Sequence, residues 1–184
     1  IDHIRRRQTA RDNLSRVAED EPYTPEPDTD HIDDDLLRLI FTCCHPSLAI
    51  EAQLALTLRE ICSLTTEQVA SALLQKPTTT AQRIVRAKRK IREANIPYEV
   101  PERKELPQRL QSVLKVVYLI FNEGYSSSEG NTVVNISLAG EAIRLAKLLA
   151  ELLPDGEVFG LLALLLLHDS RRHARQDANG ELIT

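Results

Sequence analysis

The sequence has few aromatic residues, which make up only 4% of its 184 residues. Alternating runs rich in Val, Ile and Thr, which are typical of β-strands, are also scarce, whereas leucine is abundant. These absences disfavour a β-sheet fold and predict an all-α protein. Because 42% of the residues are hydrophobic, the chain has enough apolar side chains for a packed core, which disfavours disorder over most of its length.

Cysteines are also few, and Cys43, Cys44 and Cys62 are an odd number without the spacing of a disulfide framework. No signal-peptide pattern precedes them, so we expect free thiols and a cytoplasmic location. The CCHP sequence at 43–46 contains metal-ligand types, but adjacent residues cannot easily close around one ion. We therefore expect buried thiols, with no metal or other cofactor.

Long hydrophobic runs are absent. The longest apolar block, residues 160–167, has eight residues, whereas roughly 20 are needed to span a bilayer. The block predicts a core helix and no interaction with a membrane.

Charge is distributed unevenly, although the net charge is only −4. Residues 20–35 carry eight acids and no Lys or Arg, whereas residues 76–92 carry seven bases and no acid. The low net charge argues against a protein that coats nucleic acid, but one basic element is enough for a specific contact.

Apolar periodicity and capping residues predict seven helices, at residues 33–44, 47–62, 65–75, 78–94, 106–122, 137–153 and 156–168. Ser47 is the expected cap at the start of the second helix. Thr65 with Gln68, and Thr79 with Gln82, have the T-x-x-Q spacing of a capping box for the third and fourth helices. Two proline-rich segments, at 19–32 and 98–105, predict linkers, the first of them acidic. They separate a helical domain at 33–97 from a second helical domain at 106–184.

The third and fourth helices have the layout of a helix-turn-helix, in which the second helix enters the major groove of DNA. On a helical wheel, one side of the fourth helix carries Ala81, Ile84, Val85 and Ile91. Lys88 and Arg92 fall on that apolar side, and we expect them to extend past the core. The other side carries the five residues expected to face DNA: Thr79, Gln82, Arg83, Arg86 and Lys90.

These residue types suit DNA because long cations reach phosphates, while Gln and Arg can read base edges. The alternative is an amphipathic helix whose polar face is solvated or lies on an acidic protein. Such a helix normally mixes Glu with Lys at i, i+4 spacing, whereas no acid occurs between Ala81 and Arg92. The pattern therefore favours DNA contact.

The motifs FTCCHPSL, LALTLREICSLTTEQVA and AQRIVRAKRKIR make residues 33–97 resemble region 4 of bacterial extracytoplasmic-function sigma factors. The motifs are similar to those of one branch, which carries a helical domain after region 4. YLIFNEGYSSSEG and LLALLLLHDSRRHARQDANGELI resemble that extension, at 106–184, and residues 1–18 resemble the end of region 2. Because the chain opens without Met and nearly all of region 2 is missing, we expect part of a longer protein that cannot initiate transcription alone.

The resemblance implies a promoter-specificity subunit of RNA polymerase and no enzymatic activity of its own. Region 4 would read the upstream (−35) promoter element through Thr79, Gln82, Arg83 and Arg86. The implied partners are promoter DNA, the β flap and β′ subunit of core polymerase, and an anti-sigma or other regulator. An alternative is that 106–184 forms a tetratricopeptide-like module that binds a protein or ligand.

A second candidate surface lies at 168–175, just after the most apolar helix. Its residues could bind an anion or small ligand, or contact polymerase or region 2. Alternatively, His168 caps the core and the arginines pair with nearby acids. An enzyme that uses His168, Asp169 or His173 is disfavoured, because no nucleophile elbow, phosphate loop or metal-ligand spacing accompanies them. The contact residues considered are His168, Asp169, Arg171, Arg172 and Arg175.

Overall fold

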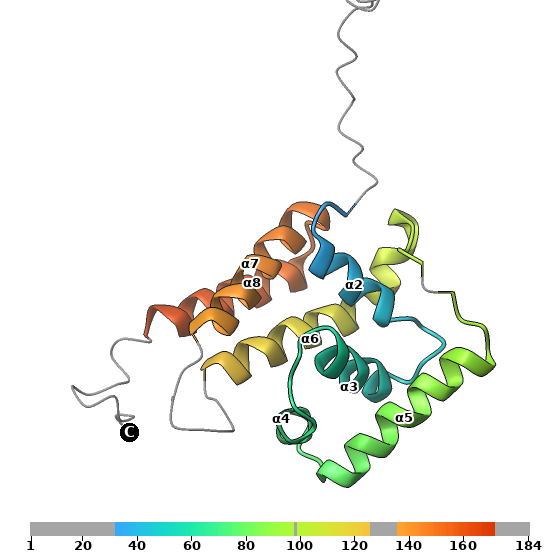
Figure 1. Cartoon of the computed structure of the whole chain (residues 1–184). Helices are drawn as coiled ribbons and strands as arrows, with labels where there is room; N and C mark the ends of the chain where they lie inside the picture. The colour runs from blue at the N-terminus through green and yellow to red at the C-terminus, as the bar shows by residue number, and fades with distance from the viewer. Residues whose placement is uncertain (1–31, 98, 126–135, 172–184) are drawn as a thin grey trace, which may run out of the picture. The chain divides into compact units, whose positions relative to one another are not determined.

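Seven α-helices and no β-strand make up the part of the chain that the computed structural model describes (Figure 1). The described residues are 32–97, 99–125 and 136–171, and they belong to a compact unit that begins at Ile32. The predicted all-α class is confirmed. The expected end of region 2 and all but the last residue of the acidic linker lie outside the described residues. No helix in these described ranges is long and apolar enough to cross a membrane.

The helices follow the predicted order, and most boundaries agree within a few residues. α3 begins at Ile50 with Ala49 as its N-cap and no side-chain cap, so the expectation that Ser47 caps it is wrong. α6 continues to Tyr125, beyond the predicted end at 122. The elements are α2 (Asp35–Cys43), α3 (Ile50–Glu60), α4 (Thr66–Ala72), α5 (Pro77–Glu93), the short 3-10 helix η1 (Arg103–Glu105), α6 (Leu106–Tyr125), α7 (Ile136–Leu152) and α8 (Gly156–Ser170).

α6 connects the two groups of helices. It packs against α2, α3 and α4, and also against α7 and α8 (Figure 1). Phe41 of α2, Phe121 of α6 and Leu149 of α7 are all fully buried in one hydrophobic cluster. Each such side chain contributes roughly 1.5–3 kcal/mol by leaving water. In the described residues, the helices expected to form a separate C-terminal domain thus share a core with those before them.

α5 lies along the outer side of the pair that it packs against, α3 and α4 (Figure 1). α4 begins with a closed capping box: the Gln68 backbone N–H donates to Thr65 Oγ1 at 3.1 Å, and the Thr65 N–H donates to Gln68 Oε1 at 2.8 Å. This prediction is confirmed. The box fixes the start of α4 within four residues, which explains why sequence alone located it.

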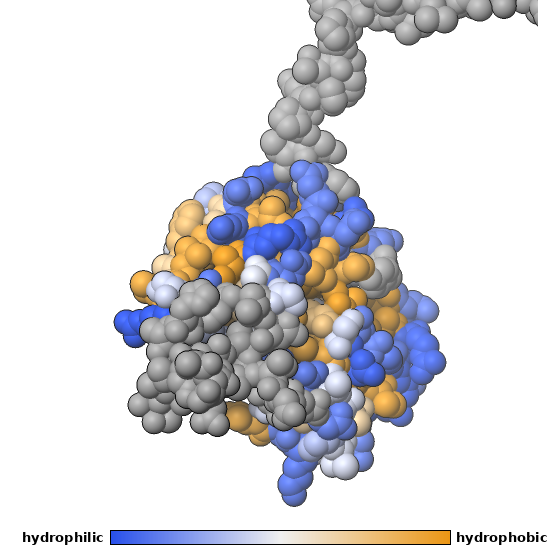
Figure 2. Space-filling model, turned by 60° about the vertical axis from the view of Figure 1, so that its left-hand side comes forward, coloured by the Kyte–Doolittle hydropathy of each residue, from blue (hydrophilic) through white to orange (hydrophobic). Residues whose placement is uncertain are grey.

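α8 is apolar on two faces. Val158 and Leu165 are buried, whereas Phe159, Leu166 and Leu167 are exposed. The predicted core helix is therefore only partly right, because α6 and α7 cover one face of α8 in the described residues. The face turned forward in Figure 2, on the side of α7 and α8, shows apolar surface lying uncovered between polar residues.

Candidate nucleic-acid interface

α5 begins earlier than its sequence suggested. Its first residue is Pro77, its N-cap is Lys76, and no side chain caps it, so the predicted Thr79–Gln82 capping box is wrong. Proline suits the first helical position because it lacks the N–H that would need a partner there. Thr79 consequently lies inside the first turn with its side chain exposed.

The buried face of α5 is also rotated from the predicted one. Thr80, Ile84 and Ala87 are buried, whereas Ala81 is exposed and Val85 is 65% exposed. The helical wheel predicted the buried face mainly from the larger apolar side chains. Packing instead places the small side chains of Thr80 and Ala87 against the neighbouring helices, a rotation of roughly 60°.

The five predicted DNA-facing residues nevertheless come together. They line one shallow groove of about 290 Å³ between α5 and the start of α3. The residues that α5 contributes are Thr79, Gln82, Arg83, Arg86, Ala87 and Lys90, and those from the start of α3 and the segment before it are Leu48, Ala49, Glu51 and Ala52.

Two of the cations are held in place by neutral groups. Arg83 Nη1 donates to Gln75 Oε1 in the turn between α4 and α5, and Lys90 Nζ donates to the Ser47 carbonyl. These contacts restrict both side chains, and among the residues that the structure describes neither cation has an acidic partner. Within the described ranges, the side chains of Gln82 and Arg86 have no hydrogen bond or ion pair, and both residues are exposed.

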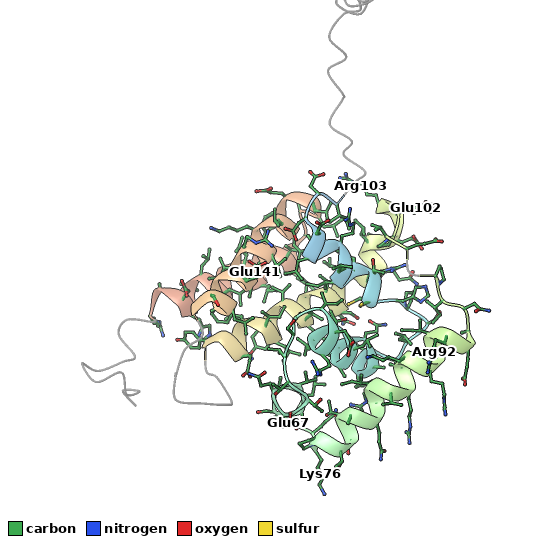
Figure 3. The ribbon with its side chains drawn as sticks, viewed as in Figure 1. Glu67, Lys76, Arg92, Glu102, Arg103 and Glu141 are labelled. Carbon is green, nitrogen blue, oxygen red and sulfur yellow. The ribbon has the colours of Figure 1, made fainter. Side chains whose placement is uncertain are left out.

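The other basic residues of α5 separate from this set. Lys88 Nζ lies 2.8 Å from Glu60 Oε2 of α3, and Arg89 Nε lies 3.6 Å from Glu93 Oε1. Lys88 therefore reaches an acid on α3, which agrees with its exclusion from the DNA-facing set. Figure 3 shows nitrogen-tipped side chains along α5 between Lys76 and Arg92, pointing away from the core.

The turn before α5 contains a backbone conformation unusual for its residue. Leu74 has φ of 54° and is 95% exposed. This left-handed region is normally occupied by Gly at the end of a helix, because a Cβ crowds the following carbonyl. The turn thus stores strain beside the groove.

The second candidate surface is described only in part, since Arg172 and Arg175 lie outside the described residues. The ring of His168 meets those of Phe121 and Tyr125 edge-on, at centroid distances of 6.4 and 5.6 Å. His168 is itself exposed, so its ring lies at the surface against these two aromatic side chains. Arg171 is exposed, and Asp169 is half-buried.

The cysteines are free, as predicted. Burial is the main cause that raises the pKa of the Cys43 thiol to about 11, and it raises those of Cys44 and Cys62 to about 12. Thiols with such pKa values are poor nucleophiles at neutral pH. Across the described ranges, no cluster of three or more His, Cys, Asp or Glu side chains could hold a metal ion.

Sequence reasoning missed an apolar pocket of about 280 Å³ near the end of α5. It has no local sequence signal, because its walls come from α2, α3 and the segment after α5. Its lining consists of Thr42, Cys43, His45, Leu48, Leu56, Glu60, Ile61, Ile91, Ile96 and Pro97.

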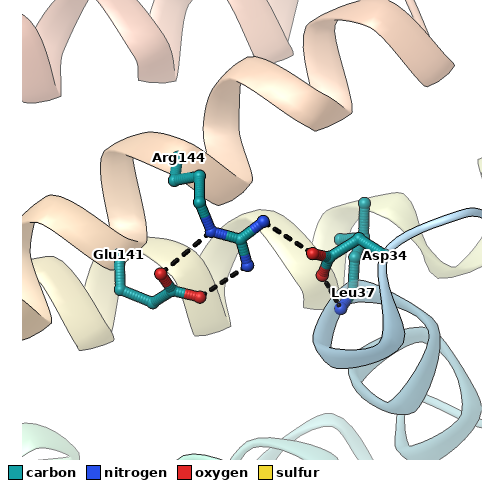
Figure 4. A network of polar contacts seen from close by, with 4 residues as sticks. All are labelled: Asp34, Leu37, Glu141 and Arg144. Atoms are coloured by element: carbon teal, nitrogen blue, oxygen red, sulfur yellow. Dashed lines mark hydrogen bonds and ion pairs between the residues drawn. The ribbon is translucent and has the colours of Figure 1, made fainter.

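Three polar links between α6 or α7 and the preceding helices were also missed. Arg144 of α7 donates to Asp34, the N-cap of α2, at 2.6 Å, and to Glu141 (Figure 4). Burial alone would raise the pKa of Asp34, but hydrogen bonds from Arg144 and the Leu37 N–H outweigh it and lower that pKa. The other two links come from Arg109 and Glu123, which lie on the buried stripe of α6.

The sequence signal for the links made by α6 was a charged residue on an otherwise apolar stripe of that helix. Arg109, Val113, Val116, Ile120 and Glu123 follow i, i+4, i+7, i+11 and i+14 spacing, and all five are buried. Buried charges require partners, so the two ends of this stripe predict contacts to distant residues.

The fold and the groove thus define an all-helical protein with a basic helix at its edge. Residues 109–184, which begin within α6, match a family described as a family of unknown function, DUF6596. The chain is 46% identical over 154 residues, 83% of its length, to an uncharacterized protein of Rhizobium meliloti (strain 1021). It spans 36% of that relative's length. No solved structure matches the chain.

Proposed function

We propose that the protein is a sigma-type transcription initiation factor whose α4–α5 pair binds the upstream promoter element. The observation that carries this proposal is that all five predicted residues line one groove beside α3. A capped short helix, a tight turn and a longer basic helix supply the layout in which the second helix enters the major groove.

The groove offers two kinds of contact. Gln82 and Arg86 are exposed and can form bidentate hydrogen bonds with base edges, while Arg83 and Lys90 can pair with phosphates. The first turn of α3 has no side-chain cap, so its backbone N–H groups also favour an anion. Glu51, the acid of the groove, opposes this attraction.

In vitro selection from random duplex DNA, followed by fluorescence anisotropy with a selected duplex, tests the proposal. Reversing two charges with Arg83→Glu and Arg86→Glu should weaken binding by about 100-fold or more, since each specific contact is worth roughly 1–3 kcal/mol. Lys115→Glu with Lys147→Glu makes the same change of net charge on exposed residues of α6 and α7, and should have a much smaller effect.

A third variant, Glu51→Gln, should tighten binding, because it removes the acid from the groove while keeping its shape. Equal loss of binding in the Arg83/Arg86 and Lys115/Lys147 variants would show that only net charge matters. That result would reject the groove as the DNA-binding surface.

Docking on core polymerase is the second part of the proposal, and the apolar pocket near the end of α5 is its candidate site. Leu48, Leu56, Ile61, Ile91 and Ile96 supply most of its apolar lining. A pull-down with a fragment of the polymerase β flap should fail for Ile61→Glu, while binding of this variant to the selected DNA should persist.

The exposed face of α8 favours a second candidate function, a protein-interaction module. Phe159, Ala163, Leu166 and Leu167 follow i, i+4, i+7 and i+8 spacing, and all are exposed. This is the apolar stripe of a helix that packs against another element. Loss of a captured protein partner by Phe159→Glu with Leu167→Glu, with DNA binding unchanged, would support this function.

A further inference from the structure

The start of α4 is joined to α6 by a polar contact. Gln68 uses its Oε1 in the capping box of α4, which leaves its Nε2 group available. That group donates to Glu123 Oε1 of α6 at 3.0 Å, across 55 residues of sequence. One side chain therefore closes the first helix of the helix-turn-helix pair and attaches it to the C-terminal helices.

Glu123 is only 5% exposed, and a carboxylate at such a site requires hydrogen-bond donors. Losing a donor would leave a buried acceptor incompletely satisfied, which is more costly than losing a surface contact. The contact therefore resists displacement of α4 relative to α6.

The position of α4 matters for α5 because the two helices pack together and are joined by a short turn. Arg83 of the groove donates to Gln75 in that turn. The links from Arg109 and Arg144 end on α2 and its N-cap, whereas the Glu123 link ends on α4.

We propose that Glu123 is a positioning residue for DNA binding, which holds α4 through Gln68 and thereby sets the orientation of α5. This inference rests on the proposed function, since its effect is read at the DNA groove. Glu123 itself does not touch DNA. A change in the C-terminal helices that displaces Glu123 would therefore alter the orientation of α5 through Gln68 and α4.

An exchange of the two side chains tests the link. Gln68→Glu keeps the oxygen that accepts from the Thr65 N–H, so the capping box survives, but it removes the donor and faces Glu123 with a second carboxylate. Glu123→Gln keeps an accepting oxygen. The double exchange supplies a donor from position 123 to an acceptor at position 68.

DNA affinity is measured by anisotropy with the selected duplex, at protein concentrations corrected for the folded fraction. Gln68→Glu should weaken binding by about 3- to 30-fold. This is the typical size of the effect when a mutated residue does not touch the ligand but lies between two coupled sites. Glu123→Gln keeps an accepting oxygen and should weaken binding less than Gln68→Glu does, and the double exchange should recover most of the loss. Parental affinity in Gln68→Glu, or no recovery in the double exchange, would overturn the proposal.

Amide hydrogen exchange separates this inference from the proposed function. Gln68→Glu should accelerate exchange in α4 and α5 more than in α8, and the double exchange should reverse the change. If the parent chain binds no DNA, the proposed function fails, while this exchange pattern still tests the mechanical link. If Gln68→Glu does not fold, Glu123→Gln is compared with Glu123→Leu, and equal exchange in α4 and α5 would overturn the link.

Discussion

Arg109 offers the sharpest test of how the two groups of helices are held together. It is 5% exposed, and its Nη1 donates to the Phe41 carbonyl at 3.0 Å. Phe41 lies in the last turn of α2, where carbonyls have no partner within the helix and a cation is favoured by the helix dipole. We expect Arg109→Ala to destabilise the protein substantially.

The magnitude follows from three contributions. A hydrogen bond from a charged group is worth about 1.5–3 kcal/mol. The lost side-chain methylenes add roughly 2 kcal/mol at about 0.8 kcal/mol each. Relief for Arg109 Nε, which is buried without a partner in the described residues, offsets about 1–2 kcal/mol. The net cost of Arg109→Ala is therefore about 1.5–4 kcal/mol.

Arg109→Met keeps most of the apolar stem and should cost about 1 kcal/mol less than Arg109→Ala. Glu105→Gln should change stability by less than about 0.5 kcal/mol, because its oxygen is 3.8 Å from Arg109 and its side chain is 43% exposed. Urea unfolding followed by circular dichroism measures all three, with Lys115→Met as an exposed control on α6. A cost below 1 kcal/mol for Arg109→Ala, or an equal cost for Glu105→Gln, would refute the assignment of the stabilisation to the carbonyl contact.

Three further predictions concern pH, strain and thiol reactivity. Because the pKa of Asp34 is lowered in the folded state, its contribution to stability should be complete above the ordinary value of 3.8 and lost as pH falls through the lowered value. Urea unfolding at pH 7 and pH 3 should therefore show a smaller pH effect in Asp34→Asn, which keeps an N-cap. Leu74→Gly should raise stability by roughly 1 kcal/mol by relieving its positive φ, measured as a higher urea midpoint; a lower midpoint would contradict the strain. With its thiol pKa near 11, Cys43 should be only about one part in a thousand thiolate at pH 8, so a disulfide reagent should react slowly until urea unfolds the chain.

The sequence predicted those features that depend on residues close together in the chain, such as the start of a helix. The capping box at Thr65 and Gln68 spans four residues, so the sequence located the start of α4 closely. At α5, Pro77 and Thr79 offered competing starts, and the proline determined the first residue. The five residues that the wheel placed together line one groove, but the wheel misplaced the buried face, because packing of Thr80 and Ala87 outweighed the hydrophobicity of Val85.

Contacts between distant residues were not predictable in the same way. Gln68 and Glu123 are 55 residues apart, and Arg109 and Phe41 are 68 apart. A single sequence shows that a charge falls on an apolar stripe, but not which donor or acceptor the fold will bring to it. These partners depend on the fold, in which α6 packs against both groups of helices.

The two buried charges of α6 have a further consequence. Arg109 and Glu123 are 14 residues apart on one helix, about 21 Å at 1.5 Å per residue, and they hold α2 and α4 respectively. A rigid helix fixed at two separated points restricts both sliding and rotation of its neighbours. Removing residues 106–184 would also strip buried partners such as Phe121 from the core that α2 and α3 share. Such a truncation would test the stability of the remaining helices, so only point variants can separate DNA recognition from folding.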